Sequence, residues 1–278
     1  MADEIQTARR EHEPVVAVLE EEFDALVGLG RELRDGEFDV ATACPGWTVR
    51  DVFSHLVGIE RTLLGDPEPP ALEVVPPHVR NPLGARNEAW VASRRALPGA
   101  AVVAEFAAVA TRRLEQLRGM PTERFDQVGP SPAGEMPYRE FMHVRVMDCW
   151  VHEQDIRLAT HRPGHRHGPP AAMAVDRLAA ALPYVVARKA AAPEGSRVRF
   201  EVGGAISRRI EVAVRSGRGV VVSPMAEPTC TLRLDAEAFW RLTCGRVPAA
   251  AALAEGLVQL SGDQRLASAV LGAMAFMI

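Results

Sequence analysis

The chain has 278 residues, which is long for one average domain and suits two. Apolar residues make up 47% and charged residues 24%, the ordinary mixture of a globular protein. The net charge of −4 argues against a nucleic-acid-binding protein, which needs a basic face. We therefore expect a globular protein without a nucleic-acid partner.

The N-terminal segment MADEIQTARREHEP is polar and acidic, and it lacks the apolar core of a signal peptide. No apolar run reaches the ~18 residues of a membrane-spanning helix. The four cysteines form no C-x-x-C pair, which favours free thiols in a reducing compartment. These features predict a cytoplasmic protein with no membrane partner.

Apolar residues recur at helical spacing through most of the first half of the chain. The expected helices cover residues 14–33, 48–63, 83–95, 100–118 and 138–160. The Pro-rich segment 66–82 and the segment GPSPAGEMP, residues 129–137, are predicted to be loops. The pattern indicates a bundle of four main helices joined by long connections.

The second half begins after a Pro- and Gly-rich segment, RPGHRHGPP, which indicates a domain boundary. We expect domains at residues 1–165 and 166–278. An apolar helix is predicted over residues 171–191, followed by short strands such as the one carrying Val198, Phe200 and Val202 on one face. Helices over 235–244 and 263–277 complete a small α+β domain, with an antiparallel sheet covered by helices.

Asp148 and His152 are four residues apart in the last helix of the first half. This spacing puts both side chains on one helix face, one turn apart. Two ligands placed in this way can reach one metal ion, as in H-E-x-x-H zinc helices, with a carboxylate replacing one imidazole. An ordinary intrahelical hydrogen bond or ion pair is the structural alternative.

His55 lies among core-like residues in the segment SHLVG of an earlier helix. A histidine there can be a hydrogen-bonded core residue, or it can face the Asp148/His152 helix across the bundle. In the second case three protein ligands would leave one position open, the arrangement of a catalytic zinc site. Nickel and iron also accept such ligands.

The segments ACPGWTVRDVFSHLVGIE and RVMDCWVHEQDIRLA together resemble the mycothiol-dependent maleylpyruvate isomerase family. Its N-terminal domain is a DinB-like four-helix metal-binding bundle of actinobacterial proteins. The resemblance implies metal ligands at His55, Asp148 and His152, with Asp148 in place of the commoner Glu. The C-terminal half, with its strands and the segment AEGLVQLSGDQRLASAVL, resembles the sterol-carrier-like domain that often follows.

The resemblance further implies mycothiol as a thiol cosubstrate, activated as thiolate on a divalent metal, with zinc expected. The thiolate would attack a small electrophile, so that the protein would be an S-transferase or an isomerase. One alternative is a non-catalytic ligand-binding or regulatory protein with a structural or vestigial metal site. Another is a metal-dependent hydrolase. The substrate and the oligomeric state stay open.

Several other residues are candidates for the site. Arg145 could bind an acidic substrate or pair with Asp148, and Asn87 could line the pocket. Arg246 and Arg265, in the second domain, could reach a carboxylate-bearing substrate. Asp155 could orient His152 or bond Arg157, and Cys44 could be a nucleophile or a buried structural thiol.

Overall fold

The computed structural model describes residues 13–132, 134–223 and 227–277. By its contacts the chain forms two units, one of Met1–Asp39 with Val49–Arg145 and one of Val40–Thr48 with Val146–Ile278. The division falls inside one long helix, α6 (Tyr138–Ala159), and the domain boundary near residue 165 stays a prediction. The acidic N-terminal segment, on which the expectation of a cytoplasmic location partly rests, lies almost wholly outside the described residues.

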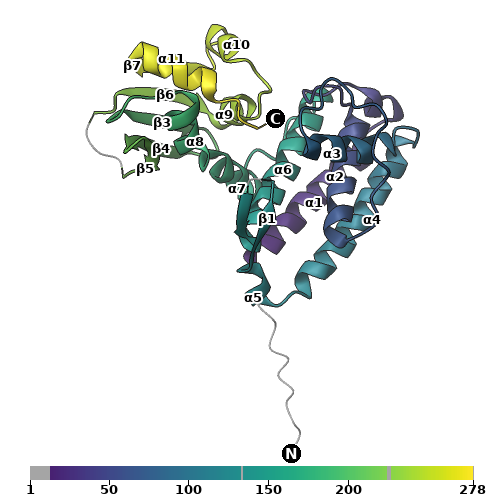
Figure 1. Ribbon diagram of the computed structural model, residues 1–278. Coiled ribbons are helices and arrows are strands. Elements are labelled where there is room, and N and C mark those ends of the chain that lie inside the picture. The colour runs from purple at the N-terminus through teal and green to yellow at the C-terminus, as the bar shows by residue number, and fades with distance from the viewer. Residues whose placement is uncertain (1–12, 133, 224–226, 278) are drawn as a thin grey trace, which may run out of the picture. The chain divides into compact units, whose positions relative to one another are not determined.

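The first unit is a helical bundle, as expected from the sequence. In Figure 1 its long helices run side by side, and α4 contacts both α1 and α2. The helices are α1 (Pro14–Glu32), α2 (Val49–Leu64), α3 (Pro82–Ala92), α4 (Gly99–Arg118), the short α5 (Thr122–Phe125) and the start of α6. Every expected helix of this half is present, with ends within about three residues of the prediction.

The bundle core is aromatic where α1, α2 and α4 meet. Phe106 packs edge-on against Phe23, with ring centroids 5.5 Å apart, and its ring is tilted against that of Phe53, with centroids 6.2 Å apart. A Cβ on Gly58 would lie 2.5 Å from the side chain of Trp90, so a glycine is needed where α2 meets α3. These contacts fix α2, the helix that carries His55.

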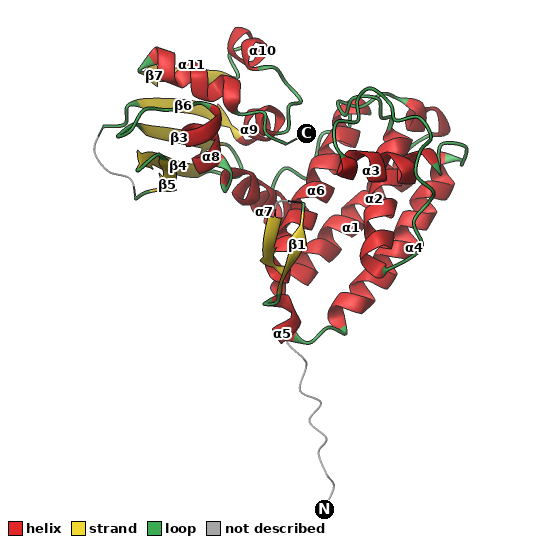
Figure 2. Cartoon of the chain, viewed as in Figure 1, coloured by secondary structure: helices red, strands yellow, loops and turns green. Residues whose placement is uncertain are grey.

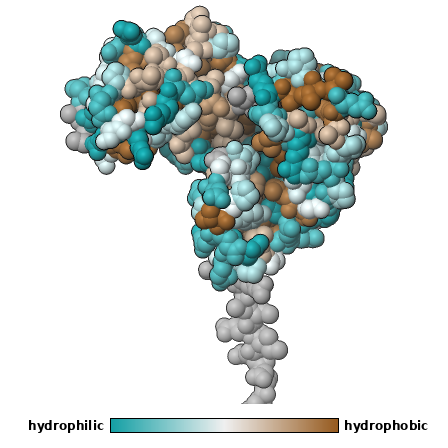
Figure 3. Space-filling view, viewed as in Figure 1, coloured by the Kyte–Doolittle hydropathy of each residue, from teal (hydrophilic) through white to brown (hydrophobic). Residues whose placement is uncertain are grey.

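The connection between α2 and α3 is irregular, as its prolines predicted. It exposes apolar side chains, with Val74 81% and Val75 49% exposed. Figure 3 shows apolar residues gathering over the loop-bearing end of the bundle. The prediction of a loop at residues 129–137 was wrong, because β1 (Val128–Ser131) and β2 (Gly134–Pro137) form an antiparallel hairpin there. Four-residue strands rich in Gly and Pro carry no alternation that a sequence pattern could reveal.

The second unit contains a five-stranded sheet in the order β5-β4-β3-β6-β7 (Figure 2). Its strands are β3 (Arg197–Gly203), β4 (Arg208–Arg215), β5 (Arg218–Val221), β6 (Cys230–Asp235) and β7 (Val258–Gly262). On β3 the alternate residues Val198, Phe200 and Val202 are buried, as predicted. Three of the four strand pairings are antiparallel as expected, but β3 and β6 pair in parallel, so the sheet is mixed.

Helices α9 (Ala236–Thr243) and α11 (Gln264–Ala273) contact the β3, β6 and β7 part of this sheet. Asp235 caps α9, because its side chain accepts a hydrogen bond from the Ala238 amide. Between them in the sequence lie α10 (Ala249–Ala254) and β7, which the sequence pattern does not predict.

The apolar stretch predicted as one helix over 171–191 is divided. It contains α7 (Gly168–Ala179), α8 (Leu182–Tyr184) and a π-helical turn (Val185–Lys189). Among the described residues this is the one stretch, Gly168–Lys189, whose length and composition would allow a membrane span. Since α8 and the π-helical turn contact β4 and β5, the stretch has the character of a core helix.

Candidate functional site

A tight turn in residues 40–48 fixes the position of Cys44. Pro45 and Gly46 are its central residues, and the Trp47 amide donates to the Cys44 carbonyl at 3.1 Å. Gly46 has φ of +78°, which a type II turn requires at this position and glycine adopts without strain. The sequence C-P-G-W thus forms a turn that carries a buried thiol at its first residue and the Trp47 ring at its last, and both side chains lie near His152.

Helix α6 carries three polar side chains at helical spacing toward this turn. The Nε2 atom of His152 lies 3.7 Å from Asp148 Oδ1, one turn earlier. On the other side of the imidazole ring, Nδ1 lies 3.2 Å from Asp155 Oδ2. The Trp47 ring lies beside the imidazole, with centroids 6.2 Å apart. The two ring nitrogens of His152 therefore face two different carboxylates.

Cys44 and Arg246 complete this arrangement, which we name the His152 cluster (Cys44, His152, Asp155 and Arg246). The Cys44 thiol donates to Asp155 Oδ2 at 3.1 Å and lies 3.8 Å from His152 Nδ1. Arg246 donates from Nε to Asp155 Oδ1 at 2.9 Å and from Nη2 to Oδ2 at 2.8 Å. Asp155 is fully buried, and a buried charge needs a partner. The Arg246 guanidinium compensates the charge of this carboxylate.

The electrostatics of this cluster favour charged side chains. Burial alone would lower the pKa of His152, but the charge of Asp148 and the hydrogen bonds to Asp155 and Cys44 outweigh it and raise that pKa to about 10. Burial would raise the pKa of Asp155, but His152 and Arg246 hold it below its usual range. A metal ion at His152 would have to displace a proton from the imidazole.

The structure places the predicted ligands as follows. Asp148 is half-buried and His152 buried, both on α6, whereas His55 is buried on α2. Asp148 and His152 belong to one unit of the chain and His55 to the other, so the metal site that would join the three stays a prediction. One carboxylate and two imidazoles suit zinc, so the donor set fits the expected metal.

The other candidate residues have different environments. Arg145 is buried and donates to Glu60 Oε1 from Nε at 3.0 Å and from Nη2 at 2.6 Å. Arg113 donates to the second oxygen of Glu60 at 3.2 Å. We name these three residues the Glu60 cluster. Asn87 is half-buried on α3, and Arg265 is exposed on α11.

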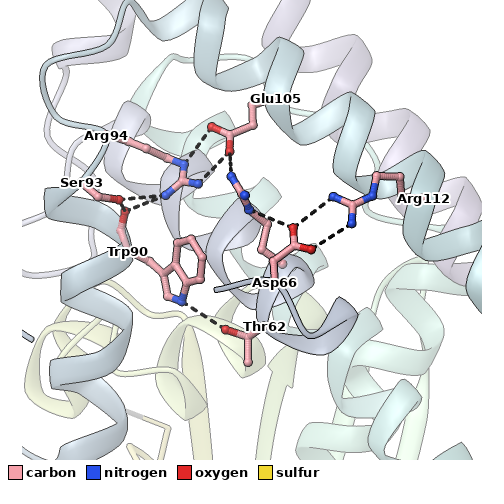
Figure 4. A network of polar contacts seen from close by, with 8 residues as sticks. Thr62, Asp66, Trp90, Ser93, Arg94, Glu105 and Arg112 are labelled. Atoms are coloured by element: carbon pink, nitrogen blue, oxygen red, sulfur yellow. Dashed lines mark hydrogen bonds and ion pairs between the residues drawn. The ribbon is translucent and has the colours of Figure 1, made fainter. Parts of the chain in front are cut away.

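Figure 4 shows a second polar network in the bundle, beside a shallow hollow of about 320 Å³. Glu105 accepts from Arg94 at 2.9 and 2.7 Å and from Arg61 at 2.8 Å. Arg94 also lies over the Trp90 ring, 5.0 Å from its centroid. Since its guanidinium groups are already paired with carboxylates, we interpret this network as one that stabilises the helical bundle.

Comparison with known proteins identifies the family. The model of the mycothiol maleylpyruvate isomerase N-terminal domain matches residues 19–157, and the model of the C-terminal domain of that family matches residues 172–269. The chain belongs to the mycothiol maleylpyruvate isomerase family. The predicted family is thereby confirmed, and with it the prediction that the protein is an enzyme.

Solved structures of this family share the fold. The crystal structure of a mycothiol-dependent maleylpyruvate isomerase aligns with a TM-score of 0.57 and 16% identity, covering 89% of this chain and 91% of that one. A histidine-to-alanine mutant of that enzyme gives 0.56 over the same shares, also at 16% identity. A sterol carrier protein 2-like protein from Aedes aegypti covers 35% of this chain and 89% of its own, at 19% identity with a TM-score of 0.28, too low to establish a shared fold. No curated protein matches the chain.

The sequence alone does not assign the roles of Asp155, Cys44 and Arg246. Of the two partners expected for Asp155, His152 lies beside it, whereas Arg157 bonds Glu153 at 2.7 Å. The H-x-x-D spacing in α6 and the C-P-G-W turn were the available signals. No local pattern linked either of them to Arg246, which is 91 residues from Asp155.

Proposed function

We propose that this protein is a metal-dependent, mycothiol-using S-transferase or isomerase that acts on a small electrophilic substrate. The observation that carries the proposal is the match of both family domains, combined with Asp148 and His152 side by side on α6. His55, Asp148 and His152 are the proposed ligands, and zinc is the proposed metal. When bound, the metal supplies a positive charge at which a thiol is deprotonated.

The residues of the chain hold and shield this centre. His152 would offer Nε2, the ring nitrogen on the side of Asp148, while Asp155 holds the opposite edge of the ring. Trp47 lies beside the imidazole, with ring centroids 6.2 Å apart, and would limit the access of water from that side. Asp148 stands where Glu is usual in the family and would offer the same carboxylate chemistry from a side chain that is one methylene shorter.

The first experiment is elemental analysis of the purified protein, of His152→Ala and of His143→Ala. His143 is the matched control, because it lies on the same helix and its ring is 30% exposed. We expect one zinc per chain in the wild type and in His143→Ala, and none in His152→Ala. No metal after purification without chelators, and none after reconstitution, would refute the proposal.

The second experiment separates the classes of reaction. The metal-loaded protein is mixed with maleylpyruvate and other small electrophiles, with and without mycothiol. Turnover that requires mycothiol supports the proposal, whereas turnover without any thiol would favour the metal-dependent hydrolase. Bound metal with no turnover of any electrophile would favour the regulatory or ligand-binding alternative.

A further inference from the structure

The His152 cluster contains more hydrogen-bonding groups than metal ligation needs. One edge of the imidazole, at Nδ1, is surrounded by Asp155 Oδ2 at 3.2 Å and Cys44 Sγ at 3.8 Å. The other edge, at Nε2, lies toward Asp148. Because Nδ1 and Nε2 point in different directions, a carboxylate that accepts from Nδ1–H leaves Nε2 as the ring nitrogen that can coordinate a metal once the metal has displaced its proton.

Asp155 is itself held in one orientation. Arg246 binds both carboxylate oxygens in a two-pronged arrangement, at 2.9 and 2.8 Å. The remaining nitrogen of the fork, Nη1, donates to the Cys244 carbonyl at 2.9 Å. Arg246 Nη2 also donates to Cys44 Sγ at 3.0 Å. A planar guanidinium fixed at three points cannot turn, so the carboxylate that it holds cannot turn either.

This arrangement argues against a second metal site at the same place. Cys44, His152 and Asp155 are spaced so that they could share a cation. However, the Arg246 guanidinium already contacts two of these three residues, and an arginine stays protonated in proteins. The positive charge that balances Cys44 and Asp155 is therefore supplied by the chain itself.

We propose that Asp155, clamped by Arg246, is the positioning residue for His152: it accepts the Nδ1 proton and directs Nε2 to the metal. Arg246 is then a second positioning residue and not a ligand for the carboxylate of a substrate. This inference rests on the proposed function, because it assigns His152 to the metal. Cys44 supports the clamp as a hydrogen-bonding thiol.

The test compares Asp155→Asn and Arg246→Gln with Arg208→Gln. Arg208 is the matched control, since it also forms a two-pronged pair with a carboxylate, Asp176, but at the surface of the same unit. Zinc affinity is measured by competition with a chromophoric chelator. We expect about a 10–100-fold loss for Asp155→Asn and Arg246→Gln, the usual effect of removing a hydrogen-bond partner behind a metal-binding histidine, and no loss for Arg208→Gln.

A readout without metal makes the test independent of the proposed function. In the metal-free protein labelled with ¹⁵N-histidine, the His152 Nδ1–H should give a downfield, slowly exchanging proton resonance that His152→Ala removes. In Asp155→Asn it should move upfield, because an amide oxygen is a weaker acceptor than a carboxylate. In Arg208→Gln it should stay in place.

The zinc affinity and the proton resonance together distinguish failure of the positioning role from failure of the proposed function. An unchanged resonance in Asp155→Asn, or an unchanged zinc affinity in both cluster variants, would overturn the positioning role. A wild-type protein that binds no metal, but whose resonance moves in Asp155→Asn, would refute the proposed function while supporting the hydrogen bond. If Asp155→Asn does not fold, Arg246→Gln carries the same test, because it frees the carboxylate to turn.

Discussion

The Glu60 cluster and the His152 cluster are both buried sets of charged side chains, but they differ in chemistry. In the Glu60 cluster, one carboxylate accepts from two guanidinium groups. Arg113 uses its other nitrogens on Gln116 at 2.5 Å, on the Tyr138 hydroxyl and on Met142 Sδ at 3.4 Å. Neither arginine can act as a metal ligand or exchange a proton near neutral pH.

The His152 cluster adds an imidazole and a thiol to the same kind of arginine–carboxylate pair. One nitrogen of the imidazole points out of the cluster, toward Asp148. An arginine–carboxylate ion pair by itself stabilises the fold. The imidazole, whose second nitrogen faces Asp148, is the feature that marks a functional site. Changes in the first cluster should therefore alter stability, and changes in the second should alter metal binding.

The largest expected effect on stability is that of Glu60→Gln. Removing the charge leaves Arg113 and Arg145 buried with a neutral partner, and losing one member of a buried ion pair costs about 3–5 kcal/mol. Urea unfolding of the metal-free protein measures this loss. The control is Glu20→Gln at the exposed pair with Arg118, which should change stability by less than about 1 kcal/mol. Loss of metal from a Glu60→Gln protein of unchanged stability would contradict the division between the clusters.

The next largest effect on stability is expected from Gly46→Ala, in the turn that carries Cys44. Alanine at φ of +78° costs about 1–2 kcal/mol, and the strain should displace Cys44 and Trp47 from His152. We expect a lower free energy of unfolding together with a few-fold weaker zinc affinity. Gly28→Ala is the control, since it lies within α1 with open space around its Cβ position. It should stabilise the protein by about 0.5–1 kcal/mol. Gly46→Ala with wild-type zinc affinity would show that the turn does not support the site.

Much of the fold could be predicted because it is local. The helices of the bundle follow from apolar spacing, and β3 follows from the alternation of Val198, Phe200 and Val202. The parallel pairing of β3 with β6 could not be predicted, since the alternation within a strand says nothing about the direction of its neighbour. The β1–β2 hairpin could not be predicted either, because its strands have only four residues each and contain Gly and Pro.

The site shows the same limit. The spacing of Asp148 and His152 is a property of one helix, and the sequence therefore revealed it. Arg246 reaches Asp155 only through the tertiary fold, so its position suggested a substrate ligand instead of a partner for Asp155. Arg145 lies on the helix turn before Asp148, but its pairing with Glu60 depends on how α2 and α6 pack.

A smaller effect is expected from Glu105→Gln in the network of Figure 4. Burial would raise the pKa of Glu105, but Arg94 and Arg61 outweigh it and lower that pKa below 4.5. This group therefore stabilises the fold fully above pH 4.5, and the contribution is lost as the pH falls through the depressed pKa. Glu105→Gln should cost about 1 kcal/mol at neutral pH. The difference from the wild type should shrink on acidification, as urea unfolding at several pH values can show. A difference that grew at low pH would mean that Glu105 is not held by its two arginines.

The smallest expected effect concerns the reactivity of two cysteines, Cys230 and Cys244, that do not belong to the His152 cluster. Burial raises the pKa of Cys230 to about 11 and that of Cys244 to about 12, so neither forms an appreciable thiolate near neutral pH. An aromatic disulfide reagent, followed by mass spectrometry of the peptides, should leave both unmodified in the native protein. Both should react once guanidinium unfolds the chain. Rapid native labelling of Cys244 would mean that the segment between α9 and Arg246 opens to solvent. A segment that opens could not keep the guanidinium of Arg246 fixed on Asp155.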